Sequence, residues 1–336
     1  MAKDKFDVLL LRPDQSVARA TFCNTPAGFK KLLLWLRRQE VSNLRACMEA
    51  TGRFGEPLAH FLHRHQVELS VVNPLIIHHF ARSEMSRNKT DAHDAWLIAR
   101  YSQLKLPRLW QPLSPERQNL KQQVRLRDQL VEHRASLQRQ RQDAPRFARK
   151  YFSAQLRLLN RQVREVEQQI AKSLQSDPGL TQDAALLQSI PGLGRITAAA
   201  ILAWMPPRTE LASARQLAAY AGVTPQQRQS GTAKGKTRLS KIGHGLLRKS
   251  LYFPAITALR CNSTVKALAR RLAQKGKSPM VIIGAAMRML LHLAYGVLKT
   301  QKPFDPAHQN AGASKLNQQQ AAASPQLAPA AAKLYP

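Results

Sequence analysis

Two aspartates, Asp91 and Asp94, stand three residues apart, directly after the basic stretch at residues 87–89. Residues 91–101 are predicted to form a helix capped by Thr90, on which the two carboxylates share one face with Cβ atoms about 5–6 Å apart. At an effective dielectric constant of 20, two such charges repel each other by about 3 kcal/mol, and a divalent cation would turn that repulsion into affinity. Acids in a first turn are also stabilised by the helix dipole, so the spacing fits either a metal site or an ordinary helix start.

Glu49 is the third acidic residue that could join such a site. It follows the apolar segment 44–48, which is predicted to be a buried strand, and it precedes a short Ala-Thr-Gly turn. Functional groups of α/β folds gather at the carboxyl ends of strands. Carboxylates from a strand end and a neighbouring helix are the ligands with which Mg²⁺ supports phosphodiester chemistry. Glu49, Asp91 and Asp94 are therefore the candidate Mg²⁺ ligands.

A basic, glycine-punctuated loop at residues 228–238 carries the candidate nucleophile Ser230, which Gly231 follows. A serine hydroxyl among cations is placed where an alkoxide that attacks phosphorus would be stabilised. Ser240 is the local alternative, and spacing does not separate the two. The loop could also simply clamp a nucleic-acid backbone, through Arg228, Lys234, Lys236, Arg238 and the following Lys241.

A tight glycine turn at residues 189–194 precedes a helix predicted for residues 196–204. A helix, a turn with Gly192 and Gly194, and a second helix would expose backbone N–H groups at a helix N-terminus. Such groups bind a DNA phosphate without reading sequence. The alternative is a plain corner between two packed helices.

The whole chain of 336 residues carries 52 Lys and Arg against 20 Asp and Glu, a formal net charge of +32. This excess predicts a polyanionic partner, most simply nucleic acid. Residues 211–304 contain no acidic residue. We therefore predict that this segment contacts nucleic acid; the alternative is an ordinary basic surface in contact with solvent. The three cysteines are far apart and outside any metal-ligand spacing, which is typical of a reducing cytoplasm.

The apolar stretch at residues 279–298 contains Arg288 and His292. Because a charged side chain at membrane depth is costly, a buried helix is predicted there rather than a membrane span. No export signal is visible in the first residues. We therefore predict a cytoplasmic protein without a membrane partner.

The elements that must position these residues change in kind along the chain. Residues 6–72 alternate strand-like and helix-like segments: a hairpin over 6–11 and 17–22, a helix from Thr25 and Pro26, and strands at 44–48 and 67–72 around a helix at 55–66. This alternation predicts an α/β domain on a mixed sheet. Residues 115–174 predict two long helices in an antiparallel hairpin. The second helix carries an apolar seam at Phe152, Leu156, Leu159, Val163, Val166, Ile170 and Leu174. A helical domain follows, and the tail is predicted to be disordered.

Several motifs in this order resemble one family. CMEATG at residues 47–52, VNP at 72–74, RNKTDAHDA at 87–95, SIPGLG at 189–194, AAYAGVTP at 218–225, QSG at 229–231 and LSKIGHGLLRKSLY at 239–252 are similar to the insertion-sequence one-ten transposases. That family includes pilin-gene invertases and bridge-RNA-guided recombinases. The resemblance covers roughly residues 2–306.

The resemblance implies a fold, a chemistry and partners. The fold would be an α/β RNase-H-like (RuvC-like) domain at 1–112, a coiled-coil hairpin at 113–176, an all-α transposase domain at 177–305 and a disordered tail at 306–336. The motif match makes Glu49, Asp91 and Asp94 three of four acids that bind Mg²⁺, and Ser230 the nucleophile. Double-stranded donor and target DNA, a noncoding bridge RNA and homodimers or homotetramers would be the partners.

One departure from the family concerns the first of its four acids. In the family that aspartate ends an opening strand, followed by a stretch like residues 2–8 here; Asp4 and Asp7 are close but do not match its position. Either translation starts upstream and restores the strand, or this copy has lost cleavage. Three hypotheses therefore stand: a DNA transposase or recombinase, a metal-dependent endonuclease that uses water, and a nucleic-acid-binding protein without catalysis.

Overall fold

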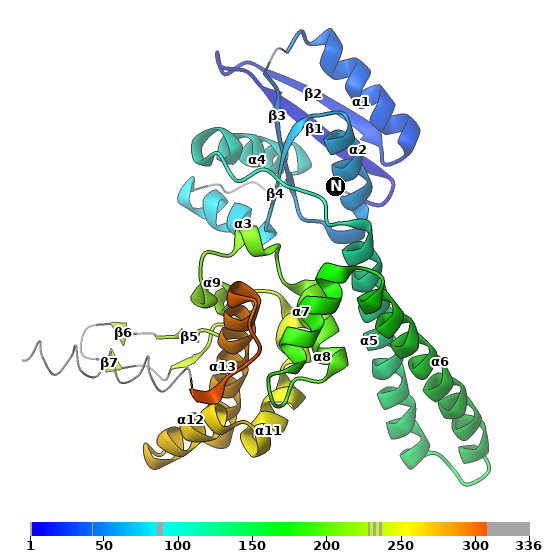
Figure 1. Cartoon of the computed structure of the whole chain (residues 1–336). Helices are drawn as coiled ribbons and strands as arrows, with labels where there is room; N and C mark the ends of the chain where they lie inside the picture. Colours follow the sequence, from blue (N-terminus) through cyan, green and yellow to red (C-terminus); the bar gives the residue numbers. More distant parts are fainter. Residues whose placement is uncertain are drawn as a thin grey trace, which may run out of the picture. The chain divides into compact units, whose positions relative to one another are not determined.

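The computed structural model describes residues 2–41, 43–85, 90–227, 229–230, 233–234 and 237–307. The chain divides into two compact units, Met1–Pro112 and Leu113–Pro336. The elements of unit 1, in chain order, are β1 (Lys5–Leu11), β2 (Val17–Cys23), α1 (Pro26–Arg38), β3 (Arg45–Glu49), the short 3-10 helix η1 (Gly52–Phe54), α2 (Glu56–Arg64), β4 (Glu68–Val72), α3 (Pro74–Ser83) and α4 (Asp91–Lys105) (Figure 1).

Polar caps fix where α1, α3 and α4 begin. Thr25, Asn73 and Thr90 each accept a hydrogen bond from a backbone N–H of the first turn of α1, α3 and α4, respectively. Proline follows the cap in α1 and α3, where its missing N–H removes no helical hydrogen bond. The predicted hairpin, the start of α1 and the Thr90 cap are confirmed, and the helix predicted for residues 91–101 continues to Lys105.

The strands of unit 1 form two separate pairs. β1 and β2 are antiparallel, whereas β3 and β4 are parallel, with Arg45 opposite Glu68 and Glu49 opposite Val72. The prediction of one mixed sheet is therefore wrong for the residues that the structure describes. The physical reason is that β1 and β3 border a cavity, and no strand of the described residues pairs with both of them.

Two apolar clusters hold the helices of unit 1 against these strands. Phe6, Phe29 and Phe61 are buried, with ring centroids 6.0 Å apart for the first pair and 5.5 Å for the second, so they tie β1 to α1 and α2. A smaller cluster that includes Phe80 and Leu97 joins β4, α3 and α4. In addition, α4 lies against both β1 and β3.

Unit 2 is mainly helical. Its elements are α5 (Pro115–Asp143), α6 (Arg149–Gln175), α7 (Pro178–Gln188), α8 (Arg195–Trp204), the 3-10 helix η2 (Arg208–Glu210), α9 (Ala214–Tyr220), the two-residue strands β5 (Pro225–Gln226), β6 (Gln229–Ser230), β7 (Ala233–Lys234) and β8 (Arg238–Leu239), and α10 (Gly245–Ser250), α11 (Tyr252–Cys261), α12 (Ser263–Gln274) and α13 (Pro279–Thr300). The four short strands are an addition to the predicted all-helical domain.

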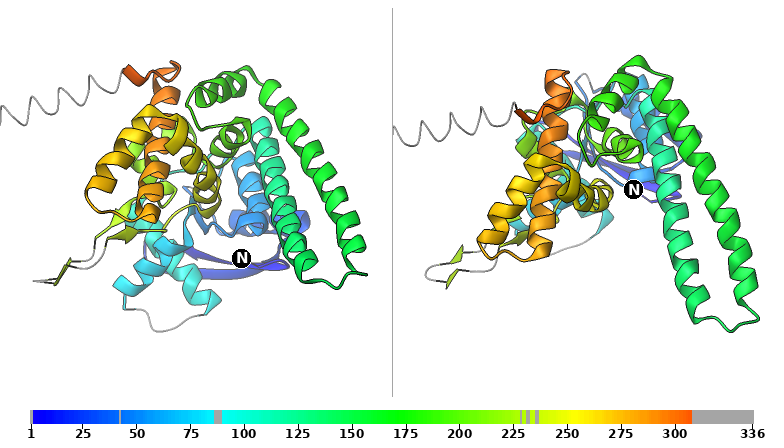
Figure 2. Two further views of the ribbon diagram at one scale, coloured as in Figure 1. Left: turned by 90° about the horizontal axis from the view of Figure 1, so that it is seen from below. Right: turned by 60° about the horizontal axis from the view of Figure 1, so that its bottom comes forward.

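The helices α5 and α6 form a long hairpin whose helices lie side by side (Figure 1, Figure 2). Arg127 pairs with Glu167 at 2.9 Å, and about two turns later Arg134 donates to Asn160 at 3.2 Å. Partners advance along α5 as they retreat along α6, so the helices are antiparallel. The predicted seam is largely buried, at Leu156, Leu159, Val163, Ile170 and Leu174.

The core of unit 2 forms around α13. This helix packs against α7, α9, α11 and α12, and it buries Leu290, Leu291 and Ala294 completely. By length and composition α13 could cross a membrane, but half of its most apolar stretch is buried inside the unit. Its apolar sequence is therefore accounted for by its place in the core, as predicted.

The four-part division predicted from the sequence stays a prediction. The base of the α5–α6 hairpin, at Leu120, Val124, Ile170 and Leu174, belongs to the same apolar cluster as the helices from α7 onward. The predicted disordered tail lies outside the described residues from position 308 onward.

Candidate active site

The three predicted metal ligands line one cavity in unit 1. Glu49 is the last residue of β3, and Asp91 and Asp94 stand in the first turn of α4. All three contribute to the wall of a cavity of about 560 Å³, together with Asp7 of β1. The packing of α4 against β1 and β3 therefore places acidic residues of three elements along the wall of one cavity.

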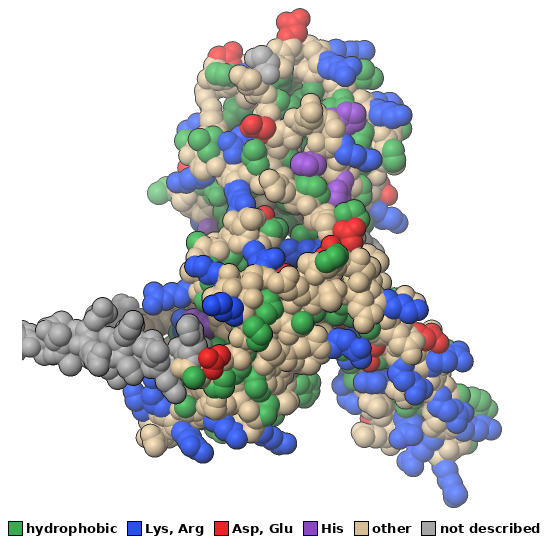
Figure 3. Space-filling view, viewed as in Figure 1, with side chains coloured by type: hydrophobic (Ala, Val, Ile, Leu, Met, Phe, Trp, Pro, Cys, Tyr) green, Lys and Arg blue, Asp and Glu red, His purple; other side chains and the backbone are tan. Residues whose placement is uncertain are grey.

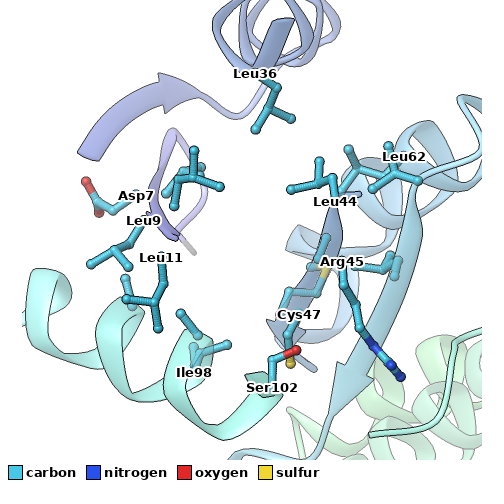
Figure 4. A pocket seen from close by; sticks show the side chains of 18 of the residues that line it. Asp7, Leu9, Leu11, Leu36, Leu44, Arg45, Cys47, Leu62, Ile98 and Ser102 are labelled. Carbon is cyan, nitrogen blue, oxygen red and sulfur yellow. The ribbon is translucent and has the colours of Figure 1, made fainter. Parts of the chain in front are cut away.

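The cavity runs beside the edges of β1 and β3. Its lining includes every residue of both strands, whereas a cavity over one face of a strand would be lined by alternate residues. Figure 4 shows Leu9 and Leu11 on one side, Leu44 and Cys47 on the other, and Ile98 of α4 between them. Neither strand has a partner on the edge that faces the cavity, among the residues described.

We call the part of the cavity lining formed by Glu49, Asp91, Asp94 and Asp7 the acidic wall. Its carboxylates are oxygen ligands of the kind that Mg²⁺ prefers. However, no group of three or more His, Cys, Asp or Glu side chains lies close enough together to hold a metal ion in the part of the chain that the structure describes. The Asp7 carboxylate accepts a hydrogen bond of 2.6 Å from the Thr21 hydroxyl on β2. These side chains alone therefore do not complete a metal site.

Cys47 lines the same cavity but is unsuited to be a nucleophile. Burial raises the pKa of its thiol to about 11, against the lowering effects of a hydrogen bond with Ser102 and the charge of Arg45. Because the thiolate is the reactive form, a thiol with this pKa is inert at neutral pH.

The glycine turn between α7 and α8 has two distinct positions. Gly192 has φ +103°, and a Cβ built on it would lie 2.8 Å from the Ala258 Cβ on α11. Gly194 is the exposed N-cap of α8, and nothing lies within 4 Å of a Cβ built there. Gly192 thus meets the demands of a packed helix corner, while Gly194 leaves the N-terminus of α8 open to a ligand.

The serine loop, residues 228–238, is bounded and crossed by two short antiparallel strand pairs. Pro225 pairs with Leu239 and Gln226 with Arg238, and further along the loop Ser230 pairs with Ala233. The side chain of Ser230 lies outside the described residues. Ser240 directly follows β8, is partly buried and donates its backbone N–H to the Thr224 carbonyl at 2.9 Å. Ser230 belongs to unit 2 and the acidic wall to unit 1, so their predicted meeting is untested.

His244 and Arg248 fix the backbone just after the serine loop, a role that sequence reasoning missed. Arg248 donates to the carbonyls of Ala221 at 3.0 Å and Lys241 at 3.1 Å. The His244 ring lies between Trp204 and Tyr220, with centroids 5.2 and 5.6 Å away. Its Nδ1 accepts the Leu247 N–H at 3.2 Å and caps α10. Burial, and then the charges of Lys121 and Arg248, lower the pKa of His244. Only the Gly-His-Gly sequence at 243–245 could have marked this position.

The structure describes the side chains of some of the predicted DNA-binding cations. Arg238 and Lys241 are exposed. Arg228 and Lys236 lie outside the described residues, as does the side chain of Lys234. Figure 3 shows Lys and Arg side chains gathered over the α5–α6 hairpin, with few acidic side chains among them. The basic character of unit 2 therefore extends beyond the segment that lacks acids.

Comparison with known proteins places these features in a family. The model of the Transposase IS116/IS110/IS902 family matches residues 184–270, and a second model described as a transposase matches residues 1–144. The chain is 34% identical to the pilin gene-inverting protein of Moraxella bovis over 314 residues, 91% of this chain and 96% of that protein. The chain belongs to the IS110 transposase family.

Other relatives agree with this assignment. The pilin gene-inverting protein of Moraxella lacunata is also 34% identical over 91% of this chain and 96% of that protein. The transposase for insertion sequence element IS1111A of Coxiella burnetii is 25% identical over 63% of this chain and 65% of that protein. The resemblance read from the motifs is therefore confirmed, and this transposase has the acidic wall within one matched segment and the serine loop within the other.

Proposed function

We propose that this transposase is a site-specific DNA recombinase that cleaves and rejoins strands through a serine nucleophile, with Glu49, Asp91 and Asp94 contributing to a Mg²⁺ site. The observation that supports the proposal is that all three residues, from β3 and α4, line the wall of one cavity. When bound, Mg²⁺ would neutralise charge on phosphate oxygens.

The proposed nucleophile is Ser230. Its Oγ attacks the phosphorus of a phosphodiester; the new Oγ–P bond replaces the P–O bond to the leaving strand, whose oxygen takes up the proton that the serine loses. The phosphoserine link is itself a phosphodiester, so a later strand can displace the serine and rejoin the DNA without an external energy source. The cations of the basic loop would stabilise the charge that develops at the phosphate.

The proposal also includes a strand in the cavity, which would give unit 1 an RNase-H-like sheet. The Ala2 N–H donates to the Lys5 carbonyl at 2.9 Å, a bond typical of a two-residue hairpin loop. A chain segment ahead of Ala2 would therefore run antiparallel to β1, along its open edge, and parallel to β3. Such a strand would end beside Glu49, where the family's remaining aspartate would complete the ligand set.

The proposed partners follow from charge and from the family resemblance. Donor and target DNA would contact unit 2, where residues 211–304 have no acidic residue and where Gly194, Arg238 and Lys241 are exposed. A noncoding bridge RNA would carry base specificity by pairing. Homodimers or homotetramers in the cytoplasm would bring acidic wall and serine loop together.

The test is covalent trapping on a nicked DNA substrate taken from the ends of the element. The protein is expressed with any residues encoded in frame upstream of Met1. We expect it to form a Mg²⁺-dependent covalent adduct with the DNA. The adduct should be absent in Ser230→Ala and retained in the matched control Ser240→Ala. Loss in Ser240→Ala instead would move the nucleophile to Ser240.

Two other outcomes would replace the proposal. Metal-dependent cleavage that persists in Ser230→Ala without an adduct would make the protein an endonuclease that uses water. DNA binding without cleavage under any metal, and unchanged in Asp91→Ala, would make it a nucleic-acid-binding copy. This last function is favoured by the incomplete ligand set among the described residues.

A further inference from the structure

The loop end of the α5–α6 hairpin carries a surface that the proposed chemistry does not use. The base of the hairpin packs into the core of unit 2, whereas Leu137, Leu156 and Leu159 form a separate small cluster nearer the loop. Both ribbon views show the loop end extending away from the other helices of unit 2 (Figure 1, Figure 2). The outer surface of this end is therefore open to a partner.

Two aromatic side chains are exposed at this end. Phe147, in the turn between the helices, is 74% exposed, and Tyr151, in the first turn of α6, is 60% exposed. Neither ring is needed to close the turn, because Arg149 Nε donates to the Ala144 carbonyl at 3.0 Å and the Tyr151 N–H donates to the Ala148 carbonyl at 3.0 Å. Large aromatic rings stabilise a fold when they are buried, so two exposed rings on a fixed turn indicate contact with a partner.

The same end of the hairpin is strongly basic. Residues 133–164 contain nine Lys or Arg residues and one acid, Asp143. Arg146 and Lys150 stand next to the two aromatic residues and are exposed, and Lys150 Nζ lies 5.0 Å from the centre of the Tyr151 ring. This charge repels a second copy of the same surface and attracts a polyanion. The chemistry of the partner is therefore that of a nucleic acid.

The exposed rings indicate which form of nucleic acid fits. In a duplex the bases are stacked on one another and hide their faces. The unpaired bases of RNA loops, bulges and ends instead stack on aromatic side chains. A strand bound by stacking also places its phosphates near cations beside the rings. An unpaired RNA segment thus uses both features of the surface, whereas a duplex would use only its charge.

We infer that the loop end of the hairpin binds an unpaired segment of RNA. Phe147 and Tyr151 stack on its bases, and Arg146 and Lys150 contact its phosphates. Stacking tolerates any base, so this surface holds the RNA without reading its sequence. The inference rests on the proposed function for the presence of an RNA partner and adds the place where the protein holds it.

The test is binding of the full chain to two RNAs of equal length, a hairpin with a long unpaired loop and a fully paired duplex. We expect Phe147→Ala and Tyr151→Ala each to raise the Kd for the loop RNA by roughly 5- to 150-fold, the loss of one stacked base. The Kd for the duplex should stay unchanged. Tyr151→Phe keeps the ring and should bind the loop RNA as the wild type does.

Salt dependence separates the rings from the cations. Each phosphate contact with a single strand contributes about 0.7 to the slope of log Kobs against log salt concentration. We expect Arg146→Gln to lower the slope for the loop RNA by about that amount. Tyr151→Ala should raise the Kd and leave the slope unchanged. A fall of the slope in Tyr151→Ala equal to that in Arg146→Gln would contradict stacking.

Phe253→Ala is the matched control, because Phe253 of α11 is an aromatic residue of the same unit that is 75% exposed. Its Kd for the loop RNA should equal that of the wild type. An equal loss in Phe253→Ala, or no loss in both Phe147→Ala and Tyr151→Ala, would overturn the site.

Leu158→Ala tests for a second copy of the chain on this surface. Leu158 is 44% exposed and follows Tyr151 by seven residues of α6, so the two share one face of the helix. We expect sedimentation to show the same oligomeric state in Leu158→Ala, Tyr151→Ala and the wild type. A loss of oligomers in both variants, with an unchanged Kd for the loop RNA, would assign the surface to a second copy and overturn the inference.

Ultraviolet cross-linking in cells that express the full chain identifies the source of the strand. We expect RNA nucleotides on the peptides that contain Phe147 or Tyr151, and DNA nucleotides alone at these positions would overturn the RNA assignment. RNA binding needs no cleavage. A normal Ser230 adduct without any preference for the loop RNA would refute this site alone. A preference that depends on Tyr151, without any adduct, would refute the proposed chemistry and leave this site standing.

Discussion

Gly192 and Gly194 lie two residues apart in one turn, yet glycine is required at the first position and not at the second. The positive φ of Gly192 and its closeness to Ala258 leave no room for a side chain. Gly194 has an ordinary φ of −86° and open space around it. A short motif can therefore combine a packing requirement with an exposed helix N-terminus, and the sequence reading that set these two against each other was too simple.

Alanine at each glycine separates the two roles. We expect Gly192→Ala to lower the free energy of unfolding by about 1–3 kcal/mol, because an L-residue is strained at this φ and must displace Ala258. Gly194→Ala should lower it by about 1 kcal/mol or less, since alanine is only a poorer N-cap. Urea unfolding of both variants measures the difference, and equal losses would contradict this account.

His244 makes the stability of unit 2 depend on pH. Burial and the neighbouring cations Lys121 and Arg248 lower its pKa in the folded state, so below about pH 6.5 the unfolded chain binds more protons than the folded one. The free energy of unfolding is therefore highest above the unfolded-state pKa and falls as the pH drops from that value through the lower folded-state pKa. His292, whose pKa is also lowered, acts in the same direction.

The variant His244→Asn isolates this contribution, because asparagine can still cap α10 but does not titrate. We expect the loss of unfolding free energy between about pH 7.5 and pH 5.5 to be smaller in the variant than in the wild type. Denaturant unfolding at both pH values gives the comparison. An identical loss would show that His244 does not sense pH.

At the scale of elements, the open edges of β1 and β3 dominate unit 1. An edge strand leaves every second backbone N–H and C=O without a partner strand, which makes it ready to pair with another strand. Here two such edges border one cavity. The hydrogen bond from Ala2 to Lys5 already turns the backbone toward that space.

An added strand should therefore protect both edges. We expect a seven-residue extension of alternating Val and Thr ahead of Ala2 to slow amide hydrogen exchange in β1 and β3, since both edges gain backbone partners. An extension of equal length made of Gly and Ser is the control and should leave exchange unchanged. If both extensions act alike, the cavity is not an acceptor for a strand.

The sequence predicted the local structure well and the long-range structure less well. Caps such as Thr25 and Thr90, and the seam on α6, are local signals, and the structure agrees with them. Glu49, Asp91 and Asp94 line one cavity, as their strand-end and helix-start positions suggested, while their role as metal ligands stays a prediction. The stacking around His244 and the contact of Gly192 with Ala258 depend on packing between distant segments, which no single motif encodes.

At the scale of the whole molecule, the order of the elements decides when unit 2 can fold. Its core closes around α13, the last helix described, which packs against α7 about one hundred residues earlier in the chain. During synthesis the apolar faces of α7, α9 and α11 therefore emerge from the ribosome before the helix that covers them. A nascent transposase cannot mature until translation has passed Thr300, so premature termination before α13 yields a chain for chaperones and proteases rather than a shortened recombinase.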